Sequence, residues 1–114
     1  MKNFNLVATT IRKLKNLLVQ PGSKPTPIKF GLARGISMEI DPAHNTQRLY
    51  GLYEREIARA VGKYTKQANT IVDIGAHDGY YTVTFSVLNP NAKIFACEPE
   101  QEFKGKCLRN LNLN

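Results

Sequence analysis

The chain has 114 residues, 42% of them hydrophobic, and a formal net charge of +7 at neutral pH. This length suits one small domain, and this hydrophobic content argues against intrinsic disorder. The charge is uneven, because residues 1–69 hold twelve Lys and Arg against four Asp and Glu, whereas residues 70–114 hold four against five. No apolar run approaches the length of a membrane span and no signal peptide is visible, so we expect a cytoplasmic protein.

The first segment, residues 1–19, predicts a basic amphipathic helix. Its apolar side chains recur at helical spacing and its Lys and Arg residues lie mostly on other faces; the apolar positions are Val7, Ile11, Leu14 and Leu18. Such a helix either docks on its own domain or lies on a membrane surface, so residues 1–19 leave peripheral membrane contact open. We expect no nucleic-acid partner, although the positive charge permits one. Residues 20–27 hold three prolines and a glycine, which predicts a linker.

Two further elements are expected before residue 70. Residues 28–40 alternate between apolar and other side chains on either side of the segment 33–35, which ends in Gly35, and this pattern predicts a β-hairpin. Residues 49–66 predict a helix that docks through an apolar stripe. The stripe consists of Tyr53, Ile57, Ala60, Val61 and Tyr64.

Residues 70–114 predict alternating strands and helices: a strand at 70–74, a helix at 80–88, a strand at 93–97 and a helix at 100–113. This order requires a parallel pair of strands joined by a right-handed crossover. Cys97 falls in the second strand and Cys107 on the apolar stripe of the last helix, without the spacing of metal ligands. We therefore expect two buried free thiols and no metal site.

The most informative segment follows the first of these strands. An apolar run ends in Asp73, and Gly75 and Gly79 bracket a tight loop before the helix. Ligands of open α/β sheets bind at the carboxyl ends of the strands, and glycines let the backbone turn sharply and approach a ligand closely. His77 stands where the dinucleotide fingerprint requires its second glycine, and no P-loop is present. A carboxylate at this edge suits a ligand that carries a cation and hydroxyls, such as S-adenosylmethionine.

A second carboxylate supports the same ligand. Glu98 ends the second strand, nineteen positions after Gly79. An acidic side chain at about this offset is placed to accept hydrogen bonds from ribose hydroxyls, and such charge-assisted bonds are stronger than neutral ones.

Together these segments resemble the FkbM-type methyltransferases, a class I, Rossmann-like family that depends on S-adenosylmethionine. The resemblance rests on DIGAHDGYYT at 73–82, FACEPE at 95–100, LRNLNLN at 108–114 and RLYGLYE at 48–54, within residues 28–114. It implies methyl transfer to a hydroxyl oxygen of a small molecule, glycan or lipid. The cofactor residues that it implies are Asp73, Gly75, Ala76, His77, Gly79, Tyr80 and Glu98.

The resemblance has two departures. His77 stands where the family more often has Asn. The family also has a larger sheet, of which residues 28–114 would supply the first two parallel strands, so we expect an incomplete Rossmann-like fold without a catalytic base. Two other functions stay open: a nicotinamide-dependent oxidoreductase fragment, and a non-catalytic module that binds membrane or nucleic acid through its basic N-terminal segment.

Overall fold

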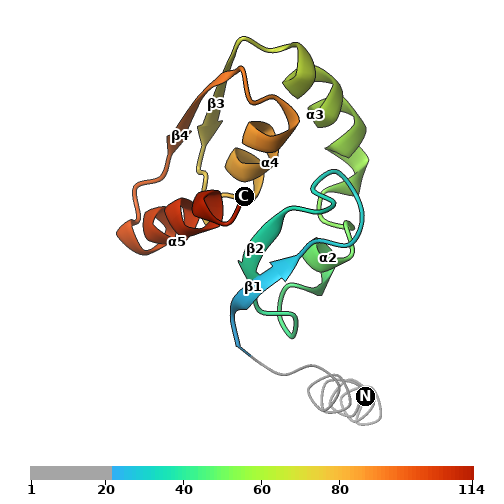
Figure 1. Ribbon diagram of the computed structural model, residues 1–114, viewed down its shortest axis with the longest axis vertical. Helices are drawn as coiled ribbons and strands as arrows, with labels where there is room; N and C mark the ends of the chain where they lie inside the picture. The colour runs from blue at the N-terminus through green and yellow to red at the C-terminus, as the bar shows by residue number, and fades with distance from the viewer. Residues whose placement is uncertain (1–21) are drawn as a thin grey trace, which may run out of the picture.

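The computed structural model describes residues 22–114, so the helix predicted within residues 1–19 lies outside the described residues. The described chain is an α/β structure with one antiparallel hairpin and one small parallel sheet (Figure 1). Its elements are β1 (Lys24–Pro27), β2 (Ser37–Ile40), α2 (Thr46–Leu49), α3 (Arg55–Gln67), β3 (Thr70–Ile74), α4 (Tyr80–Leu88), β4 (Lys93–Cys97) and α5 (Gln101–Asn112).

The hairpin begins earlier than the sequence predicts. β1 occupies residues 24–27, which we expected to be linker, and it pairs with β2 in the register Lys24↔Ile40 to Pro27↔Ser37. The prolines are tolerated because β1 is an edge strand and their nitrogens face away from β2. The prediction of a linker over the whole of residues 20–27 is therefore wrong for residues 24–27.

Residues 28–36 form the connection of the hairpin instead of its first strand. Gly35 has the expected left-handed backbone, with a φ of +87°, and its N–H donates to the Ile28 carbonyl at 2.8 Å, but the loop predicted at 33–35 is replaced by this longer connection. Before that turn the chain leaves the strand direction, and the Lys29 N–H donates to the Leu49 carbonyl at 3.0 Å. Phe30 is consequently 57% exposed instead of sharing a buried strand face.

The helix expected at 49–66 is broken near its start. Gly51 and Glu54 have φ values of +67° and +46°, so the chain forms the short α2, an irregular link and then α3. A side chain at Gly51 would lie 2.2 Å from the Phe30 carbonyl oxygen. This close approach of two backbone segments requires glycine and ends the helical path.

The face that α3 buries also differs from the prediction. Gly62 and Thr65 are buried, whereas Ile57 and Tyr64 of the predicted stripe are 44% and 66% exposed. A side chain at Gly62 would come within 2.9 Å of Leu32, so a small residue lets the hairpin connection approach the helix. The apolar stripe of α3 instead borders an open groove.

The segment from β3 to α5 confirms the predicted order. β3, α4 and β4 have the expected bounds, and α5 differs by one residue at each end. β3 and β4 pair in parallel from Thr70↔Lys93 to Ile74↔Cys97. The core lies between the hairpin and α4, which in turn contacts both strands of the parallel sheet (Figure 1). Its buried members are Ile28, Ala33, Ile36, Met38, Ile40, Tyr80 and Val83.

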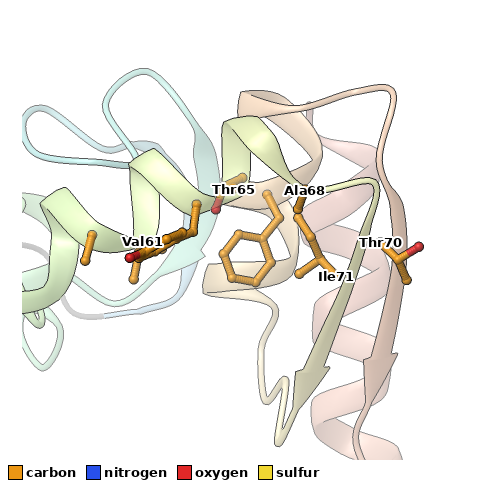
Figure 2. A pocket seen from close by; sticks show the side chains of 8 residues that line it. Val61, Thr65, Ala68, Thr70 and Ile71 are labelled. Atoms are coloured by element: carbon orange, nitrogen blue, oxygen red, sulfur yellow. The ribbon is translucent and has the colours of Figure 1, made fainter.

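One face of the parallel sheet is bare among the described residues. Val72, Ile74 and Phe95 are 57%, 84% and 57% exposed, and the register places them on the same face. A groove of about 380 Å³ opens between the end of α3, the start of β3 and α4, where Figure 2 shows Val61 and Ile71 among its apolar lining.

No helix within residues 22–114 has the length and apolar content needed to cross a membrane.

Candidate functional site: the glycine loop between β3 and α4

The glycine loop consists of residues 75–79, and it is hydrogen-bonded to the end of the neighbouring strand, β4. Gly75 and Gly79 have φ values of +78° and +87°, as expected for a sharp turn from strand to helix. The backbone N–H groups of Gly75 and Ala76 both donate to the Cys97 carbonyl, at 2.8 and 3.1 Å. The loop therefore lies across the carboxyl ends of both parallel strands, the edge at which open α/β sheets bind ligands.

Glu98 lies beside this loop and holds it. One carboxylate oxygen accepts the His77 backbone N–H at 2.8 Å, and the other accepts the Glu100 N–H at 2.9 Å. These two backbone hydrogen bonds, that of Glu100 first, lower the pKa of the Glu98 carboxyl below its ordinary value. Each oxygen has a second lone pair, so the carboxylate can still accept hydrogen bonds from ligand hydroxyls.

His77 adopts an uncommon backbone conformation at the tip of the loop. Its φ is +55°, a left-handed value that costs a residue with a side chain roughly 1–2 kcal/mol. Its ring lies against Phe103 of α5, with ring centroids 3.8 Å apart. The Glu98 hydrogen bond and this ring contact offset the cost, since strained residues persist where their surroundings fix them.

Asp73 stands at the carboxyl-terminal part of β3 and faces α4. Its Oδ2 accepts the Thr82 hydroxyl at 2.6 Å, and this is the only hydrogen bond to the carboxylate from within residues 22–114. Thr82 thus orients Asp73 and leaves the other oxygen available to a cationic or hydroxyl group. The structure therefore brings both predicted carboxylates, Asp73 and Glu98, to the loop.

Two of the expected cofactor residues are almost fully buried. Tyr80 is 4% exposed, and its ring packs edge-on against Tyr53 at 5.1 Å in the core. Ala76 is 6% exposed and donates its N–H to Cys97. The Tyr80 side chain therefore packs in the core at the start of α4 and does not line the surface of the loop.

Two contacts of the loop were not predicted from the sequence. The Arg48 guanidinium of α2 forms an ion pair with the Asp78 carboxylate, and both side chains are largely buried. The Asn110 side chain of α5 donates to the Asp78 carbonyl at 2.7 Å. The family resemblance at residues 48–54 and at 108–114 indicated the segments that contain Arg48 and Asn110. It did not identify Asp78 as the partner of either side chain.

Two cavities flank the loop. One, of about 310 Å³, lies on the hairpin side and is polar; it is lined by Ser23, Glu39, Asp41, Asn45, Arg48, His77, Asp78, Phe103 and Lys106. The other, of about 330 Å³, lies between β4 and α5; it is lined by Ala76, Ala96, Cys97, Glu98, Lys104, Cys107, Leu108 and Leu111. The loop is therefore open to a ligand from two sides.

The two thiols differ in environment. Cys107 is buried against Gly79, and desolvation raises the pKa of its thiol, although a hydrogen bond with Thr82 opposes this shift. Cys97 is exposed, contrary to prediction, because its register partner Ile74 lies on the bare face of the sheet. Within residues 22–114, no three side chains of His, Cys, Asp or Glu gather in a way that could hold a metal ion.

We expect the loop to loosen in acid. The depressed pKa of Glu98 means that its carboxylate stabilises the loop at pH values above the ordinary 4.5, and that this contribution is lost as pH falls through the lower folded-state pKa. The His77 amide resonance should therefore shift as the pH falls below the ordinary value of 4.5. Glu98→Gln should abolish this transition, and an unchanged transition in that variant would assign it to another carboxyl group.

A scan against protein-family models found no match, and searches of curated proteins and of solved structures found none either.

Proposed function

We propose that this chain is the cofactor-binding part of a Rossmann-like, FkbM-type methyltransferase that uses S-adenosylmethionine to methylate a hydroxyl oxygen. The observation that carries the proposal is the hydrogen bond from the His77 N–H to Glu98, at 2.8 Å. It joins a glycine loop and a strand-end carboxylate at the carboxyl edge of two parallel strands, which is the ligand edge of such sheets.

The side chains present fit this cofactor. Asp73 has a carboxylate oxygen available for the ammonium group of the methionine portion, and Glu98 has lone pairs for the ribose hydroxyls. The cofactor supplies an electrophilic methyl group on a sulfonium. The residues of the loop would hold and orient it, and positioning of this kind supplies much of the rate in a displacement reaction.

A larger parent sheet is part of the proposal. Val72, Ile74 and Phe95 leave one face of the β3–β4 sheet apolar and exposed. Sheets made only of parallel strands are covered on both faces, so this exposure supports further strands and helices around the same site. A hydroxyl-bearing acceptor and a catalytic base would be held by those elements.

The proposal predicts selective binding of S-adenosylmethionine. Calorimetric titration should show binding of this ligand and none of NAD, because His77 replaces the glycine that admits a pyrophosphate. Asp73→Asn keeps an acceptor for the Thr82 hydroxyl but removes the charge, and should weaken binding about tenfold. Glu56→Gln, which removes a carboxylate in the first turn of α3 that lines neither cavity beside the loop, is the control and should leave affinity unchanged. Tighter binding of NAD would refute the proposal in favour of an oxidoreductase.

A further inference from the structure

The last residues of the chain complete the free edge of the hairpin. The Asn114 side chain accepts the Ser37 N–H at 2.9 Å and donates to the Ser37 carbonyl at 2.8 Å. The Asn110 side chain accepts the Glu39 N–H at 2.7 Å. Four residues at helical spacing rise about 6 Å and two residues of strand about 6.6 Å, so the two spacings match although Asn114 lies two residues beyond the end of α5. The side chains of Asn110 and Asn114 thus take the place of a neighbouring strand.

Asn110 extends this contact to the glycine loop. It is 0% exposed, and while its oxygen accepts from Glu39 its nitrogen donates to the Asp78 carbonyl at 2.7 Å. Asp78 directly follows His77, the residue with a left-handed backbone. One buried side chain therefore connects β2 to the tip of the loop.

Arg48 provides a second connection to the same residue. Its guanidinium pairs with the Asp78 carboxylate and lies over the Tyr53 and Tyr80 rings, 4.8 and 5.4 Å from their centroids. These rings restrict where the guanidinium can go, because a cation is attracted to the ring face. Asp78 is thus held at its carbonyl by α5 and at its carboxylate by α2, and neither helix belongs to the turn itself.

We propose that Asn110 and Arg48 are positioning residues that hold the glycine loop in the conformation that accepts the cofactor. The hairpin and α2 then help to position the glycine loop, although they lie outside the β-α-β unit that contains it. A loop held in its binding conformation beforehand binds more tightly, because less ordering is required when the ligand arrives. The identity of the ligand rests on the function proposed above; the positioning of the loop does not.

The test compares Asn110 of α5 with Asn114, which lies two residues beyond the helix. Asn110→Ala removes the bonds to β2 and to the loop, whereas the control Asn114→Ala removes bonds to β2 and to the Asn110 backbone carbonyl but none to the loop. We expect affinity for S-adenosylmethionine to fall about tenfold in Asn110→Ala and less than about twofold in Asn114→Ala. Amide hydrogen exchange at His77 should accelerate by about tenfold or more in the first variant alone.

A second pair of variants covers the case in which Asn110→Ala does not fold. Arg48→Met keeps an unbranched apolar stem beside Tyr53 and removes the charge, and it should also accelerate exchange at His77. Arg48→Lys keeps the charge and should restore part of the protection. Amide hydrogen exchange does not require a ligand, so it tests the positioning role even if S-adenosylmethionine fails to bind the wild-type protein. That failure would count against the proposed function alone. Equal acceleration in Asn110→Ala and Asn114→Ala, or unchanged exchange in Arg48→Met, would overturn the positioning role.

Discussion

Gly79→Ala is expected to lower the free energy of unfolding by about 3 kcal/mol, the sum of two separate costs. The first is conformational, because Gly79 has a φ of +87° at the start of α4. The second is steric, because a side chain there would lie 2.7 Å from the sulfur of Cys107 and 3.1 Å from its Cα. The sulfur could rotate away, but the backbone of α5 could not yield without moving the helix. Urea denaturation followed by circular dichroism measures the loss.

Gly75→Ala is the matched control for this variant. Gly75 has nearly the same backbone angle, a φ of +78°, but a side chain there would meet nothing within 4 Å. Only the conformational cost applies, so the expected loss is about 1–2 kcal/mol. Equal losses in the two variants would show that α5 moves freely away from the loop, contrary to the packing of Cys107 on Gly79.

The sequence-based prediction was accurate where neighbouring residues determine the structure and wrong where contacts between distant segments determine it. β3, α4 and β4 were placed correctly because short apolar runs end at the glycines of the loop and at the turn around Pro90. β1 was missed because its prolines suggest a linker; their tolerance depends on pairing with β2 across the connection. The break between α2 and α3 was missed because it depends on contact between Gly51 and the Phe30 carbonyl, which no periodicity encodes.

The residues of the candidate site likewise fall into two groups: those that the sequence pattern identified and those that only the folded structure brings together. Asp73, the loop glycines and Glu98 were identified because carboxyl ends of consecutive parallel strands must meet at one edge. Arg48 and Asn110 reach Asp78 across 30 and 32 residues of sequence, after the hairpin and α5 have docked. The asparagines at 110 and 114 are four residues apart, a spacing that continues one face of α5 past its end at Asn112. Their partner, the free edge of β2, became apparent only with the fold.

Glu98→Gln is expected to weaken binding of S-adenosylmethionine by about 10- to 100-fold, which corresponds to the loss of charged hydrogen bonds. The substitution has two effects. It removes the negative charge that would accept the ribose hydroxyls, and it replaces one acceptor oxygen by an NH₂ group that cannot accept the N–H of His77 or of Glu100. Both effects act on the same ligand, because the loop and the carboxylate share one sheet edge.

Glu102→Gln is the control for Glu98→Gln. Glu102 lies in the first turn of α5 and pairs with Lys106 at 2.9 Å, so this change removes one negative charge from the same segment without touching the loop. The control should bind S-adenosylmethionine as the wild-type protein does. Equal weakening in both variants would mean that general charge attracts the ligand, since exposed charges act over distance and are screened by salt. Weakening confined to Glu98→Gln and insensitive to salt would indicate a local effect of this carboxylate, through its hydrogen bonds to the loop, to the cofactor or to both.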